Sequence, residues 1–135
     1  MPSLFTRIID GEIPGRFVWS DDDVVAFLTI APLTAGHTLV VPRAEVDDWT
    51  ALEPELLAKV MTVSATIGAA LRRAFGAPRA GLVVAGFEVP HAHVHVFPAW
   101  EMGDFDFGHI DPDVSAEELD ANQKRILDAL SDGKG

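Results

Sequence analysis

The sequence predicts one α+β domain, in which a five-stranded antiparallel sheet is combined with two or three helices. Three observations indicate this fold class. The 135 residues suffice for a single core, five short apolar or β-branched segments are bounded by turn residues, and one long segment of helical periodicity separates the third strand from the fourth. Because the other connections within the sheet are short, its strands are expected to run antiparallel.

The N-terminal third of the chain contains the signals of a short helix and three strands. Apolar residues recur at helical spacing between Ser3 and Asp10, and a glycine follows Asp10, so a short helix is expected there. An acidic turn at 21–23 separates two β-branched segments, which is typical of a strand hairpin. A third segment of this kind follows the turn residues 32–36. The expected strands are 17–20, 24–30 and 37–42.

The longest predicted element is a helix over Pro54–Phe75. Its apolar residues follow the i, i+3, i+4 rule, a proline stands at its start and Gly76 follows its end. Two further strands are expected after this helix, at 81–87 and 91–97, separated by a short turn at 88–90. The long helix therefore crosses between the third and fourth strands.

The region after Trp100 is acidic and is expected to form a loop and a final helix. The helix is predicted to begin at Ser115, where Glu118 completes a capping box, and to end near Leu130. The loop carries two aromatic residues and a histidine, namely Phe105, Phe107 and His109. A solvated loop is favoured over a partner contact or a specificity loop.

Composition excludes several classes of protein. Ten Lys and Arg residues against 21 Asp and Glu residues give a net charge of −11 with neutral histidine, which repels nucleic acids and anionic membranes. The absence of cysteine excludes disulfides, Cys-ligated zinc and thiol catalysis, and it suits a reducing compartment. Charged residues interrupt the N-terminal apolar stretch, and the longest uncharged stretches, 60–71 and 89–100, are shorter than the roughly 18 residues of a membrane span. A cytoplasmic protein without nucleic-acid or membrane partners is expected.

Three of the five histidines, His91, His93 and His95, alternate along one predicted strand. The period of two sends them to one face and the intervening apolar residues to the other. Such a row suits two chemistries. The histidines can ligate zinc, with Glu88 or Glu101 as the added carboxylate, or one neutral imidazole can attack phosphorus while its neighbours bind the phosphate oxygens. Periodicity alone does not choose between a metal site and a nucleophile.

The segment His91-Ala-His93-Val-His95-Val-Phe97 resembles the signature of the histidine triad (HIT) family. The similarity extends to Ala26–Arg43, with its proline-containing loop and Gly-His-Thr-Leu-Val-Val-Pro-Arg segment, and to Leu4–Pro14. It covers roughly residues 3–100 and is greatest for the Hint-like branch. The resemblance implies a HIT-like fold for a single domain over residues 1–135, to which residues 101–130 add the acidic loop and last helix.

The same resemblance implies a nucleotidyl hydrolase or transferase. It would act at the α-phosphate of a nucleoside phosphoramidate or dinucleoside polyphosphate. His93 would be the nucleophile that forms a covalent nucleotidyl intermediate, His95 would contact the phosphate and leaving group, and His91 and His37 would form a supporting hydrogen-bond relay. No cofactor or metal is implied, and the chain is expected to form a homodimer.

The resemblance also assigns a nucleotide pocket. Its candidate residues are Leu4, Phe5, Ile8, Phe27, Thr29, Leu39, Glu88 and Val89. Five of these residues are apolar and are equally compatible with a place in the pocket and with ordinary core packing: Leu4, Phe5, Ile8, Phe27 and Leu39.

Three departures from the family pattern bear on activity. Ser3 and Thr6 stand where some relatives carry two zinc-binding cysteines, so that zinc is not expected here. Thr29 replaces an aspartate that contacts the ribose. Ala85 replaces an asparagine, and Glu88 replaces a hydroxyl residue beside the phosphate, which its carboxylate should repel. Thr29, Ala85 and Glu88 leave a nucleotide-binding module without catalysis as one alternative. The histidine row leaves a metal-dependent hydrolase as another.

Overall fold

The computed structural model describes residues 1–132. Its sheet has the strand order β1-β2-β3-β5-β4, and every neighbouring pair is antiparallel. The main elements are α1 (Leu4–Ile9), β1 (Phe17–Ser20), β2 (Val24–Leu28), β3 (Thr38–Pro42), α2 (Pro54–Phe75), β4 (Arg79–Val83), β5 (Val94–Ala99) and α3 (Ala116–Asp132). The α+β class, the five strands and the three helices are confirmed.

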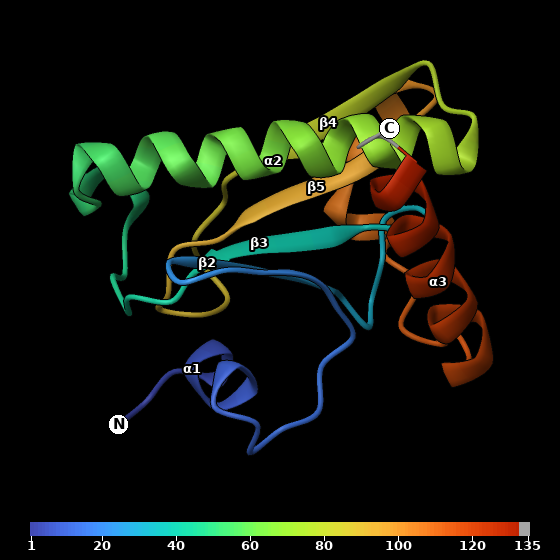
Figure 1. The fold of residues 1–135 in the computed structure, drawn as a ribbon. Coiled ribbons are helices and arrows are strands. Elements are labelled where there is room, and N and C mark those ends of the chain that lie inside the picture. The colour runs from blue at the N-terminus through green and yellow to red at the C-terminus, as the bar shows by residue number, and fades with distance from the viewer. Residues whose placement is uncertain (133–135) are drawn as a thin grey trace.

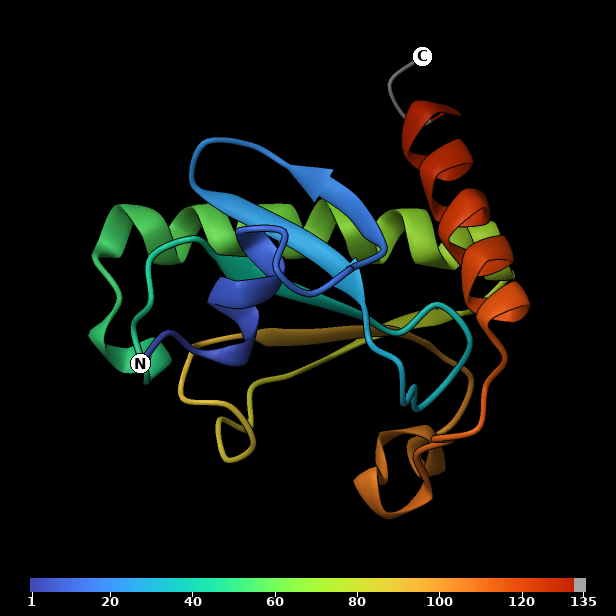
Figure 2. The ribbon, with the colours of Figure 1, turned by 90° about the horizontal axis from the view of Figure 1, so that it is seen from below.

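The helices cover different parts of the sheet, with α1 and α2 on opposite faces. In Figure 1, α2 lies along one face and α1 lies below the other, while α3 packs at one end; Figure 2, seen from below, shows α1 in front of the sheet. The α2 face contains the larger apolar core, which includes Ile67, Val94 and Val96. The α1 face has a smaller cluster around Phe5 and Phe27.

The last two strands differ from their predicted bounds. Strand β4 begins two residues earlier than expected and ends at Val83, and β5 begins at Val94 rather than His91. Pairing between β4 and β5 runs from Arg79 opposite Ala99 to Val83 opposite His95. Beyond that pair the chain leaves the sheet, because Gly86 has a φ of 81° and proline at position 90 has no N–H to donate. The expected three-residue turn is thus a loop over 84–93.

Helix α2 ends as predicted, at Gly76 in the left-handed conformation with a φ of 66°. By length and composition alone, this 22-residue helix would suffice to cross a membrane, since an 18-residue window of it has a mean hydropathy of 1.2; within residues 1–132 it is the one helix of which this is true. Ile67 and Leu71 are fully buried in the core against the sheet, whereas Met61 is 40% exposed. This packing is that of a core helix, which the same composition also suits.

Helix α3 starts where the capping signal predicts. The Ser115 Oγ accepts the backbone N–H of Glu118 at 3.1 Å. The helix extends to Asp132, slightly beyond the predicted end. Two long-range hydrogen bonds join it to the segment around β1: Arg16 Nε donates to Asp120 Oδ1 at 2.8 Å, and Gln123 Nε2 donates to the Phe17 carbonyl at 2.9 Å.

Candidate active site

His93 lies on the face of the sheet that carries α1. It directly precedes β5, is 3% exposed, and its ring centroid lies 4.8 Å from that of Phe5 and 5.0 Å from that of His95. The predicted alternation is therefore seen, since Val94 and Val96 contact the core on the α2 face. Two imidazoles stand close enough to engage one small ligand.

The hydrogen bond of His93 indicates which of its nitrogens carries the proton. Its Nδ1 lies 2.8 Å from the backbone carbonyl of His91. A carbonyl oxygen only accepts, so Nδ1 is the protonated nitrogen and Nε2 of the neutral ring has a free lone pair. Burial lowers the pKa of His93 despite the opposing effect of the His91 carbonyl and Glu88. The ring is therefore neutral near pH 7, as a nucleophile requires.

His95 is oriented by His37. The backbone N–H of Leu33 donates to His37 Nδ1 at 2.9 Å, so His37 Nε2 carries the proton and donates to His95 Nδ1 at 3.0 Å. The remaining nitrogen of a neutral His95, Nε2, is then an N–H donor. Burial and the neighbouring imidazole lower the pKa of His37 to about 3, and burial and His93 lower that of His95 to about 4. Both rings are neutral at pH 7.

The two outer nitrogens face accessible space. Within residues 1–132 every fully buried side-chain nitrogen or oxygen has a hydrogen-bond partner. His93 Nε2 and His95 Nε2 have none, so neither is fully buried. A lone pair on one ring and an N–H on its neighbour are thereby presented together to a ligand.

His91 takes a different place from the one expected for a relay. Its ring is fully buried, with Nε2 donating to the Pro42 carbonyl at 2.8 Å and Nδ1 lying 2.7 Å from Ser3 Oγ. The ring is not bonded to another histidine. His91 supports the site through its backbone carbonyl on His93, whereas His37 acts through its ring on His95.

A cavity of about 350 Å³ opens beside His93 and His95. All eight sequence-predicted pocket residues line it: Leu4, Phe5, Ile8, Phe27, Thr29, Leu39, Glu88 and Val89. Phe5, Phe27 and Leu39 also belong to the apolar cluster beneath α1. These three side chains therefore pack in the core and line the cavity at the same time. His37 and His91 stand behind the cavity and do not line it.

Sequence reasoning missed the loop that closes the far side of this cavity. Residues 13–16 line it, and Arg16 brings a guanidinium whose Nε is paired with Asp120. The stretch between Arg79 and Lys124, which contains the histidine row, has no Lys or Arg. Arg16 nevertheless brings a cationic side chain to the cavity from a distant part of the sequence. Its position directly after the Ile-Pro-Gly turn was the available signal.

The acidic segment after Trp100 is not merely a solvated loop. It folds into two short 3-10 turns, Met102–Phe105 and Phe107–His109. The Phe107 ring lies 4.9 Å from His95 and 6.4 Å from His37, centroid to centroid, and both pairs meet edge to face. The aromatic residues of this segment turn inward because they find apolar partners on the histidine face, while Glu101 and Asp106 remain exposed.

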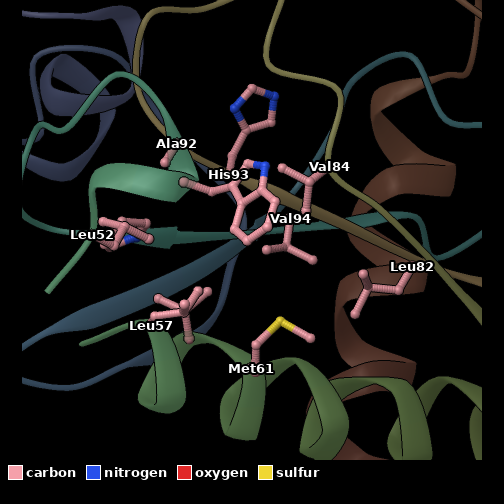
Figure 3. A pocket seen from close by; sticks show the side chains of 11 residues that line it. Leu52, Leu57, Met61, Leu82, Val84, Ala92, His93 and Val94 are labelled. Atoms are coloured by element: carbon pink, nitrogen blue, oxygen red, sulfur yellow. The ribbon is translucent and has the colours of Figure 1, made fainter. Parts of the chain in front are cut away.

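A second cavity, of about 330 Å³, lies behind the histidine strand on the α2 face. Its lining is apolar and includes Leu57 and Met61 from α2 and Val94 from β5. Figure 3 shows the His93 imidazole directed away from Leu57 and Met61. His93 nevertheless lines this cavity as well as the one beneath α1, so the residue borders both.

The histidine row does not fit a metal site. Within residues 1–132, no group of three or more His, Cys, Asp or Glu side chains is arranged to hold a metal ion. Both ring nitrogens of His91 are engaged, and His93 and His95 each retain one open nitrogen. Ser3 and Thr6 offer hydroxyls, which are poor zinc ligands beside thiolates.

Comparisons with known proteins agree on one family. The family model of the HIT domain matches residues 10–102. An uncharacterized HIT-like protein of Saccharolobus solfataricus is 31% identical, over 94% of this chain and 96% of the relative. A hypothetical histidine triad nucleotide-binding protein of Sulfolobus tokodaii is structurally similar, with a TM-score of 0.86 and 28% identity over 96% of this chain and 93% of that one. A zinc-bound histidine triad family protein of Mycobacterium smegmatis has a TM-score of 0.83 and 27% identity, over 97% and 94% of the two chains.

Proposed function

Because the chain belongs to the HIT domain family, we propose that it is a Hint-like nucleotidyl hydrolase or transferase with His93 as its nucleophile. Membership of the family supports a nucleotide-binding, hydrolase-type function. One observation carries the finer proposal: an open lone pair on His93 stands beside an N–H donor on His95 at the mouth of one cavity. This pairing suits attack on phosphorus with stabilisation of the phosphate oxygens.

The reaction proceeds in two steps. His93 Nε2 forms a bond to the α-phosphorus while the bond from phosphorus to the leaving nitrogen or oxygen breaks, and the leaving group takes its proton from solvent. His95 Nε2–H donates to the phosphate. The nucleotidylated ring becomes cationic, and the His91 carbonyl on Nδ1–H stabilises that charge. Water then attacks phosphorus, releases its proton to solvent and restores neutral His93.

The cavity suits a nucleoside. Phe5 and Phe27 meet edge to face at 5.5 Å and, with Leu39, offer apolar surface to a base or ribose. The Thr29 Oγ1 accepts the Ala31 N–H at 3.2 Å, which leaves its own hydrogen available for a ribose hydroxyl. Thr29 can thus serve in place of a carboxylate.

Charge favours phosphoramidates over dinucleoside polyphosphates. Glu88 lines the cavity near His93. The histidines are neutral there, and Arg16 is already paired with Asp120. A substrate with a single phosphate charge is repelled less by Glu88 than a polyphosphate chain.

The test uses a nucleoside phosphoramidate radiolabelled at the α-phosphorus. Wild-type protein should turn it over and, when quenched in alkaline denaturant, carry label on histidine. His93→Ala should abolish both while keeping the wild-type circular dichroism spectrum. His109→Ala is the matched control, since its side chain is 79% exposed and lies outside the cavity. Turnover that survives His93→Ala would refute the proposal, and tight nucleotide binding without any turnover would establish the binding-module alternative.

A homodimer belongs to the same proposal. Strand β4 is an edge of the sheet, and beside it Leu82 and Met61 are 42% and 40% exposed. A second copy that pairs edge to edge would cover these side chains and the apolar cavity that they line. Light scattering should give twice the 14.5 kDa chain mass, and Leu82→Lys should give the monomer. A single domain over residues 1–135 and a cytoplasmic location remain predictions, open to limited proteolysis and cell fractionation.

A further inference from the structure

The carboxylate of Glu45 accepts hydrogen bonds from two residues at the start of α1. Glu45 Oε1 accepts the backbone N–H of Ser3 at 2.6 Å and the hydroxyl of Thr6 at 2.8 Å. These hydrogen bonds lower the pKa of Glu45, so the acceptor is ionised. Glu45 follows β3 in the chain, and more than 35 residues separate it from either donor. One exposed side chain therefore joins α1 to the segment after β3.

Ser3 connects these exposed hydrogen bonds to the buried ring of His91. Its Oγ accepts the Thr6 N–H at 3.0 Å and lies 2.7 Å from His91 Nδ1. Because His91 Nε2 donates to the Pro42 carbonyl, Nδ1 of the neutral ring is an acceptor, and the Ser3 hydroxyl donates to it. Ser3 is 6% exposed and His91 is fully buried. Loss of the hydroxyl would leave this buried acceptor with only the longer contact to Thr6 Oγ1, at 3.5 Å.

His91 in turn contacts His93, the proposed nucleophile. The His91 carbonyl accepts from His93 Nδ1, and Phe5, within the same helix as Thr6, packs edge to face on both rings at 5.9 and 4.8 Å. Neither His91 ring nitrogen is free, so its ring does not contact substrate. Its influence on the reaction passes through the position of its own backbone and of α1.

Ser3 and Thr6 hold the positions at which some relatives carry zinc-binding cysteines. Here both hydroxyls are occupied by hydrogen bonds, and no three metal-ligating side chains meet in the described part of the chain. A charge-assisted hydrogen-bond cluster connects the elements without a metal.

We infer that Ser3 and Glu45 are positioning residues, which hold His91 and thereby the orientation of the His93 ring. This inference rests on the proposed function for its kinetic readout. The cluster itself can be tested without substrate, because ring-nitrogen NMR reports the tautomers of His91 and His93 and the hydrogen exchange of their N–H groups.

The experiment compares matched pairs of variants. Ser3→Ala removes the hydroxyl and Ser3→Thr retains it; Glu45→Ala removes the acceptor and Glu45→Gln retains an oxygen that can accept both bonds. Glu12→Gln is the control, since Glu12 is an exposed carboxylate near the same helix and pairs with Arg7. Ser3→Ala should lower kcat about 10-fold and Glu45→Ala about 3-fold, because small misplacements of reacting groups cost such factors. The retaining variants and the control should stay near wild type.

The NMR outcomes decide the inference separately from turnover. In Ser3→Ala the His91 Nδ1 signal should shift and the His93 Nδ1–H should exchange faster, and Ser3→Thr should restore both. Wild-type kcat in Ser3→Ala and Glu45→Ala, or unchanged ring signals in both, would overturn the inference. If Ser3→Ala does not fold, the Glu45 pair gives the same decision. A protein without turnover but with these ring shifts would refute the proposed function and leave the cluster established.

Discussion

The two faces of the segment 93–97 are equally buried and chemically opposite. Val94 and Val96 are 4% and 1% exposed and pack into the apolar core beneath α2, while His93 and His95 are 3% and 5% exposed on the other face. The valines stabilise the fold through burial of their apolar side chains alone. Each histidine instead has one hydrogen-bonded nitrogen and one that opens into a cavity. Burial of a polar side chain is tolerated here because its inner nitrogen has a partner.

The difference separates stability from chemistry. The α2 face supplies the larger share of buried apolar side chains, so substitutions there should change the free energy of unfolding. The α1 face keeps its histidines neutral by burial, so substitutions and pH changes there should act mainly on turnover or on acid stability.

The largest expected effect on stability comes from Ile67→Ala on the α2 face. Ile67 is fully buried, and removal of such a side chain costs about 2–5 kcal/mol through lost burial and the cavity left behind. Urea unfolding measures the loss. Turnover per folded molecule should stay at the wild-type value, and an equal fall in kcat at saturating substrate would break the proposed separation.

Acid should destabilise the protein through the histidine face. The pKa values of His37 and His95 are lowered to about 3 and 4, so between pH 6.5 and 4 these rings are protonated in the unfolded chain but neutral in the folded one. The unfolded state then binds more protons, and stability falls as pH falls, by about 1.4 kcal/mol per pH unit for each ring. Urea unfolding at pH 6.5, 5.5 and 4.5 measures the slope. His37→Asn should reduce it, and the same slope in wild type and variant would contradict the assignment.

Phe107→Ala tests whether the acidic segment supports the site. The edge-to-face contact with His95 is worth about 0.5–1.5 kcal/mol, so the free energy of unfolding should fall by no more than about that amount. Because His95 is then held less firmly, kcat should fall roughly 3- to 10-fold. Met102→Ala is the matched control, because that side chain is 82% exposed in the same segment. Equal kinetics for the two variants would show that the segment does not support the site and is a solvated loop.

The smallest expected effect comes from Glu88→Gln. Removal of an exposed charge near the nucleophile should raise kcat/KM for a dinucleoside polyphosphate up to about 5-fold relative to a phosphoramidate. The effect should shrink as salt is added, because exposed charges are screened. A ratio that does not change with Glu88→Gln would show that this carboxylate does not select substrates by charge.

Much of the fold followed from local patterns. The helical spacing of α2, the Ser115 cap of α3 and the alternation around His93 depend on near neighbours in the chain, and each agreed with the structure. The bounds of β4 and β5 did not agree. They depend on where two strands stop pairing, which a single strand's composition does not contain.

The sequence by itself determined the family signature, the order of elements and the residue types that gather on one face. The tertiary structure decided the protonation of each ring, because an imidazole tautomer depends on the partner at its other nitrogen. Those partners come from far along the chain, as His37 does for His95 across 58 residues, or from a backbone carbonyl, as for His93. It also brought Arg16 and Phe107 to the site, since neither stands near the triad in sequence and only packing places them there.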